Sequence, residues 1–173
     1  MTANLGIYIA GPAVLAILCF VHEMGHILVA RHNGVQIKQV RIGMGPILWS
    51  GNWGATRILV CCLPVGVTMG ICGRRNLDGS PRRTLGQEAW IASGGLIANL
   101  IVVPLALGGM YLTKGTPLAY AIYLSGLLSL ALVLLNALPI PGLDGGHLAM
   151  LALASAGIEL SPAQERQAQI IGL

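Results

Sequence analysis

Three long stretches of this 173-residue sequence carry almost no charge, and they restrict the fold more than any other feature. A helix needs about 20 predominantly apolar residues to cross the hydrocarbon core of a bilayer. Only 9% of the residues are charged, whereas an average soluble domain has about 25%. The sequence therefore predicts an α-helical polytopic membrane protein rather than a soluble domain. We expect its spanning helices at residues 4–32, 85–112 and 117–138.

Positive charge is concentrated in one connection of the chain. Eight of the ten Lys and Arg residues lie between Arg31 and Arg83. Basic loops near helix ends stay in the cytoplasm, so we predict that this connection is cytoplasmic and the N-terminus outside, as in a bacterial inner membrane protein. The net charge of +4 thus reflects orientation in the lipid bilayer and not a nucleic-acid partner. On this topology the cytoplasmic ends of the first and third helices meet.

The long connection is itself apolar over residues 35–72. Residues 40–48 and 56–69 are rich in β-branched side chains and are interrupted by Gly and Pro, which is typical of short strands. Extended backbone at membrane depth persists only where protein covers it or it lines a cavity. We predict a re-entrant, membrane-associated β-hairpin beside the functional site, with a loose cytoplasmic hairpin as the alternative. A polar turn at 74–83 precedes the second helix.

The sequence His22-Glu-Met-Gly-His26 carries an H-E-x-x-H motif inside the first predicted helix. Spacing of four residues puts both imidazoles on one helix face, where they can bind one Zn²⁺. Glu23 can then act as a general base toward water at the metal. Ionisable residues inside a spanning helix are costly unless they are paired, hydrated or metal-bound, so this cluster indicates a functional site.

A catalytic zinc site usually has three protein ligands, and the sequence offers Asp144 as the third. Asp144 follows the third predicted helix, in a run with two prolines and three glycines that predicts a broken helix. A plain helix-capping role for Asp144 is the alternative. His147 is a rival ligand, for which a supporting role is the preferred interpretation. The two-histidine, one-carboxylate set favours zinc.

After Asp144, residues 139–158 predict a loop and a helix too short to span a bilayer. Ser161 and Pro162 have the pattern of a further helix start. We therefore expect a fourth spanning helix that is truncated in this sequence. The whole chain, residues 1–173, is predicted to be one membrane domain.

Five motifs in this order resemble the site-2 protease family of intramembrane metalloproteases, in particular its regulator-of-sigma-E protease branch. They are HEMGH at 22–26, GMGP at 43–46, LPVG at 63–66, ASGGLIAN at 92–99 and NALPIPGLDGGH at 136–147. Unlike that branch, the chain has only residues 112–117 between its second and third helices, so no PDZ domain is expected there.

The resemblance implies one catalytic zinc bound by His22, His26 and Asp144, with Glu23 as the base. It also implies that the β-region at 43–69 offers an edge to an unwound strand of a transmembrane protein substrate. The expected substrate-binding or site-supporting residues are Asn99, Asn136, Gly43, Gly45, Pro64 and Gly66. From the residues alone, hydrogen bonds to substrate or helix ends and ordinary interhelical packing remain open for the two asparagines.

The main hypothesis is therefore hydrolysis of peptide bonds in or near transmembrane segments, for example of an anti-sigma factor or a remnant signal peptide. The active site is expected in the membrane, nearer its cytoplasmic side. A catalytically silent relative that binds membrane helices is the alternative. A metal transporter is a third hypothesis, but the second and third helices supply almost no ionisable residues for a polar path.

Overall fold

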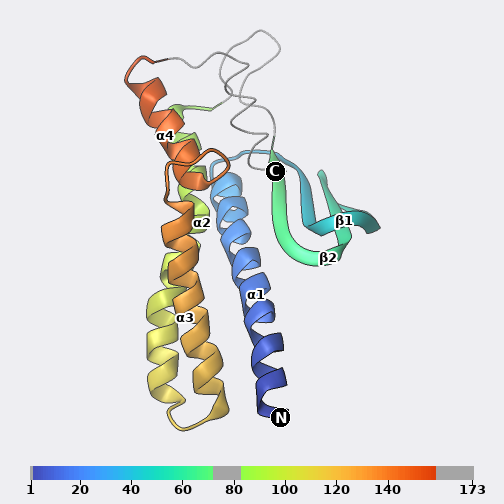
Figure 1. Ribbon diagram of the computed structural model, residues 1–173. Coiled ribbons are helices and arrows are strands. Elements are labelled where there is room, and N and C mark those ends of the chain that lie inside the picture. The colour runs from blue at the N-terminus through green and yellow to red at the C-terminus, as the bar shows by residue number, and fades with distance from the viewer. Residues whose placement is uncertain (1, 72–82, 159–173) are drawn as a thin grey trace.

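The computed structural model describes residues 2–71 and 83–158, which form four helices and two strands (Figure 1). In chain order the elements are α1 (Thr2–His32), β1 (Ile37–Trp53), β2 (Thr56–Ile71), α2 (Leu85–Leu112), α3 (Pro117–Asn136) and α4 (Asp144–Ser155). Segments of α1, α2 and α3 are long and apolar enough to cross a membrane: Gly11–His32, Leu85–Leu112 and Leu118–Asn136. The prediction of three long apolar helices is confirmed.

The third long helix ends at Asn136, slightly before the predicted residue 138. Pro139 explains the early end, because its ring excludes a continuing helix and disfavours helical backbone at Leu138. The predicted polar turn lies outside the described residues except for Arg83, and so does the predicted helix start at Ser161.

Local sequence determines where α2 begins and where the chain turns from α2 into α3. The Thr84 side chain accepts a hydrogen bond of 3.1 Å from the Gln87 backbone N–H, and the Gln87 side chain accepts one of 3.0 Å from the Thr84 N–H. This capping box satisfies two N–H groups that the start of α2 would otherwise leave unpaired. At the other end, residues 113–116 form a short turn, and Pro117 then begins α3. Only residues 113–116 separate α2 from α3.

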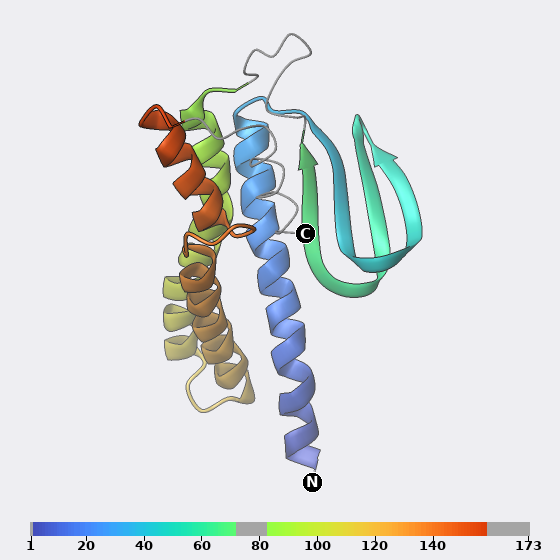
Figure 2. The same cartoon turned by 45° about the horizontal axis from the view of Figure 1, so that its top comes forward.

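β1 and β2 form an antiparallel hairpin whose strands are longer than predicted and fold back on themselves (Figure 2). Ile42 in β1 is paired with both Val67 and Val60, so two separated parts of β2 flank the same part of β1. The bend follows at Gly43 and Gly45, which both have φ of 88°. A β-carbon on Gly43 would also collide with the backbone oxygen of Leu63. Glycine therefore permits both the backbone conformation and the close approach of the strands.

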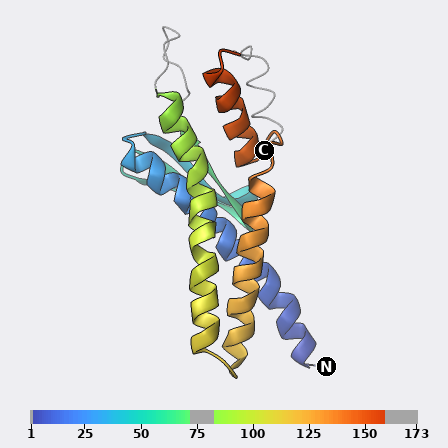
Figure 3. The ribbon, with the colours of Figure 1, turned by 90° about the vertical axis from the view of Figure 1, so that its left-hand side faces the viewer.

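Helices α2 and α3 lie side by side, and α1 crosses them at an angle (Figure 3). The hairpin packs on α1 mainly through β2. Where α1 crosses α2, Gly25 faces Gly94, and a β-carbon on either residue would collide with the backbone of the other. Small residues allow such close backbone approach in membrane helices. The crossing lies next to a buried apolar cluster made of Ile27, Ala30, Ile37 and Ile91.

Replacing Gly94 with Ala should separate α1 from α2 and lower the free energy of unfolding by about 1–3 kcal/mol, the usual cost of overpacking. Gly108 is the matched control in the same helix, because no atom lies within 4 Å of the position a β-carbon would take there. Unfolding of purified protein in detergent would be followed for both variants. Equal stability of Gly94→Ala and Gly108→Ala would contradict the tight crossing.

Candidate metal centre

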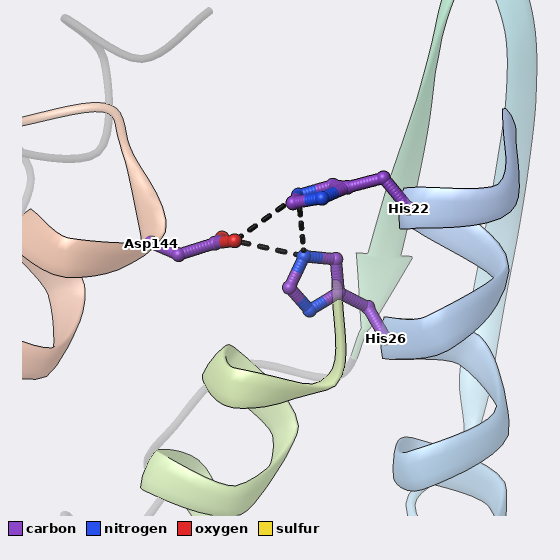
Figure 4. A group of neighbouring side chains, drawn as sticks. All are labelled: His22, His26 and Asp144. Carbon is purple, nitrogen blue, oxygen red and sulfur yellow. Dashed lines mark hydrogen bonds and ion pairs between the residues drawn. The ribbon is translucent and has the colours of Figure 1, made fainter. Parts of the chain in front are cut away.

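His22 and His26 leave the same face of α1 and approach each other at their tips (Figure 4). Their Nε2 atoms are 3.2 Å apart, and each residue is only 8% exposed. The four-residue spacing within a regular helix produces this arrangement. The predicted convergence of the two imidazoles is therefore present in the fold.

Asp144 reaches the histidines from the opposite side, as the first residue of α4 (Figure 4). One carboxylate oxygen lies 3.1 Å from His22 Nε2 and the other lies 3.3 Å from His26 Nε2. Leu143, not Asp144, occupies the N-cap position of α4. The alternative role of Asp144 as a helix cap therefore does not describe this structure.

Glycines let the chain fold tightly enough to aim Asp144 at the histidines. A β-carbon on Gly145 would collide with the backbone oxygen of Ala137, and one on Gly146 with that of Ile140. Gly142 has φ of 94°, a conformation that other residues rarely adopt. The segment after α3 thus lies directly against the first turn of α4, as the run of glycines predicted.

The three side chains present acceptor atoms to one shared point, which suits a cation. His26 Nδ1 is 2.7 Å from the backbone oxygen of Ile91 and 3.3 Å from the backbone nitrogen of Gly95. The shorter contact is to an oxygen that can only accept, so the proton lies on Nδ1 and a neutral His26 has its lone pair on Nε2. That lone pair faces His22 Nε2 and the Asp144 carboxylate, and Oδ2 of Asp144 is buried without a hydrogen bond. All three ligand atoms lie within 4.8 Å of one another. A metal ion bound by these atoms would satisfy all of them.

Glu23 lies beside the cluster but outside this set of ligand atoms. It follows His22 on α1 and is partly buried. A carboxylate next to a metal site that does not use it as a ligand is free to exchange protons with water at the metal. The role of Glu23 as the general base stays a prediction.

The two asparagines that sequence analysis singled out have different surroundings. Asn99 on α2 is completely buried, and its side-chain amide lies 3.1 Å from His22 Nδ1. The Asn136 amide instead donates to the backbone oxygen of Leu132 in its own helix. The structure therefore brings Asn99 to the metal centre and places Asn136 in a local contact.

The four hairpin residues predicted to support the site lie where the strands fold back. Gly43 and Gly45 form the bend of β1, whereas Pro64 and Gly66 belong to β2. Met44, between the two glycines, is paired with Leu63, which precedes Pro64, so these parts of the two strands lie side by side. Their predicted contact with substrate stays a prediction.

Sequence analysis missed two residues near the centre. A β-carbon on Gly95 would collide with His26 Nε2 and lie 2.5 Å from His22 Nε2, so only glycine leaves room for the ligand atoms there.

Glu88 is the second of these residues and is buried, with one carboxylate oxygen 3.4 Å from Arg83 Nη2 and the other 4.0 Å from His147 Nε2. His147 therefore lies beside Glu88 and not in the ligand set. An acidic residue in an apolar helix is itself a signal that could have identified Glu88.

Comparison with known proteins finds a matching family and several similar proteins. Residues 10–124 and 109–173 match the family model described as Peptidase family M50. A candidate zinc metalloprotease of Nostoc sp. is 33% identical over 54% of this chain and 28% of its own length. A candidate zinc metalloprotease of Helicobacter pylori is 30% identical over 59% of this chain and 34% of its own length. The regulator of sigma-E protease of Salmonella typhimurium is 33% identical over 50% of this chain and 21% of its own length.

The matched regions therefore cover about a third or less of these relatives. Within this chain, in contrast, the family model extends from residue 10 to residue 173. The three long apolar helices agree with an integral multi-pass membrane protein. Because the family model matches most of its length, this chain belongs to peptidase family M50, the family of site-2 proteases.

Proposed function

We propose that this chain is the catalytic unit of an intramembrane zinc metalloendopeptidase. The observation that carries the proposal is the convergence of His22, His26 and Asp144 within 4.8 Å, on helices that include a candidate membrane span. These three residues would hold the zinc ion. The names of the relatives, which include zinc metalloproteases, support the choice of metal.

Glu23 is the proposed general base. When bound, zinc supplies Lewis acidity that polarises the scissile carbonyl and acidifies the attacking water. Glu23 accepts the proton that this water loses on attack at the carbonyl carbon. It then delivers the proton to the amide nitrogen as the C–N bond breaks, so that one water is added across the peptide bond.

The proposed substrates are membrane proteins with a single transmembrane helix. A helix hides its peptide bonds, so part of the substrate must become extended before Glu23 and the metal can act on it. Residues 67–71 of β2 pair with β1 on one side and form the part of the hairpin nearest α1 (Figure 2). This edge supports binding of an extended substrate strand by main-chain hydrogen bonds.

We also propose that the hairpin is re-entrant and that the centre lies nearer the cytoplasmic face of a bacterial inner membrane. The centre is in the C-terminal half of α1, close to the basic residues Arg31 and His32 at its end. Basic connections are retained in the cytoplasm. Anti-sigma factors and remnant signal peptides are the substrate classes that fit such a protease.

Glu23→Gln should lower the rate of cleavage by about 10²-fold or more, because the general base is lost. Zinc content should stay at one ion per chain, because Glu23 is not a ligand. A tagged transmembrane substrate and metal analysis of the purified protein measure the two effects. Lys114→Gln, in the turn between α2 and α3, is the control and should cleave normally. Stoichiometric zinc without cleavage by the wild type would favour a silent helix-binding protein.

Asp144→Ala should weaken zinc binding by more than about tenfold, since even residues that only hydrogen-bond to metal ligands contribute about 10–100-fold to metal affinity. Competition with a coloured chelator measures this affinity. Asp144→Asn keeps the shape of the side chain and removes its charge, so it should also bind zinc more weakly. Wild-type affinity in both variants would exclude Asp144 as a ligand.

A substrate whose transmembrane helix contains Gly in place of Leu near the cleavage position should be cleaved faster than its Leu counterpart. Glycine disfavours the helix by roughly 1 kcal/mol per residue, which makes local extension easier. Initial rates on the two otherwise identical substrates provide the measurement. Equal rates would argue against unwinding as a condition for cleavage.

A further inference from the structure

The side-chain amide oxygen of Asn99 is buried and has no hydrogen-bond partner in the present orientation of the amide. The residue is 0% exposed and lies on α2 facing His22. Its Nδ2 atom is 3.1 Å from His22 Nδ1, whereas its Oδ1 atom is buried and makes no hydrogen bond. An unsatisfied buried amide oxygen is costly and calls for an explanation.

The tautomer of His22 supplies that explanation. His22 Nε2 points at His26 Nε2 and Asp144, so it needs a lone pair if it is to bind a metal. A neutral imidazole then carries its proton on Nδ1 and must donate there. The amide nitrogen of Asn99 cannot accept a proton, but the amide oxygen can. The oxygen and nitrogen of an amide have the same shape, so their assignment follows from the hydrogen bonds.

Rotating the Asn99 amide by half a turn therefore gives His22 Nδ1–H an acceptor and Asn99 Oδ1 a donor, while Nδ2 moves to the position that Oδ1 leaves. Nδ1–H of His22 then donates to Oδ1 of Asn99, and no buried amide oxygen is left unpaired. His26 is held in the same way, because its Nδ1 donates to the backbone oxygen of Ile91 at 2.7 Å. Both imidazoles thus have an acceptor on α2 behind them. Such acceptors fix the tautomer and the ring orientation of metal-binding histidines.

We infer that Asn99 is a positioning residue that holds His22 through its amide oxygen and so directs His22 Nε2 toward the metal. This inference rests on the metal-binding part of the proposed function, and not on peptide hydrolysis. In this role Asn99 orients the metal ligand His22 and does not bind substrate. The neighbouring Ser129 hydroxyl donates to the backbone oxygen of Asn99, at 3.1 Å, and among the described residues it makes no hydrogen bond to the side-chain amide of Asn99.

Metal affinity, measured on the full chain in detergent, tests the role of Asn99. Asn99→Leu has a similar size and no acceptor, so its affinity for Zn²⁺ should fall by about 10–100-fold. Asn99→Asp keeps an acceptor oxygen, so its affinity for Zn²⁺ should stay within a few fold of wild type. Ser129→Ala is the matched control for buried polar loss at the same helix contact and should bind as wild type.

Two results would overturn the inference: wild-type metal affinity in Asn99→Leu, and an equal loss of affinity in Asn99→Asp and Asn99→Leu. If wild-type affinity in Asn99→Leu came with a raised KM, Asn99 would be assigned to substrate binding. If the wild type binds Zn²⁺ but cleaves no substrate, the proposed protease function fails while these affinities still decide the role of Asn99.

A measurement on the wild type remains decisive if Asn99→Leu does not fold. With ¹⁵N-labelled histidine and Zn²⁺ bound, the His22 ring should show a protonated Nδ1 and a metal-bound Nε2. Its Nδ1–H signal should move in Asn99→Asp, where the acceptor becomes charged, and stay in place in Ser129→Ala. A metal-bound Nδ1 in His22 would contradict the inference.

Discussion

The close crossing of α1 and α2 is the contact on which the arrangement of the metal centre depends. Gly25 and Gly94 leave no side chain between the two backbones. The Ile91 carbonyl and the Asn99 amide of α2 can therefore reach the histidines of α1. A larger separation would leave the Nδ1 atoms of the two imidazoles without their hydrogen-bond partners on α2, which is costly in a membrane.

The centre combines rigid ligands from one helix with a carboxylate from a separate, glycine-rich turn. The histidines are fixed by α1 and by acceptors on α2, whereas Asp144 depends on how the chain folds after α3. The hairpin packs on the other side of α1, so its edge is held near the same helix. Ligands, base and the proposed substrate strand are thus organised around α1.

Much of this arrangement was predictable because it follows from local patterns. The lengths of the three uncharged segments predicted the three helices, and the four-residue spacing predicted His22 and His26 on one helix face. Prolines and glycines around Asp144 indicated the break that α3 and α4 show. The folded-back course of the hairpin was not predictable, because residues 40–48 have the same strand pattern whether β1 pairs with β2 once or twice. The different surroundings of Asn99 and Asn136 were also hidden, since both look alike as polar residues in apolar helices.

The sequence by itself determined which segments are long apolar helices and which residue types could bind a metal, because both depend on neighbours within a few turns of chain. Only the tertiary structure decided that Asp144 meets His22 and His26, that Asn99 lies behind His22, and that Gly95 leaves space at the ligands. These residues lie on different helices, so their meeting depends on how closely and at what angle the helices pack. No local spacing in the chain encodes that geometry.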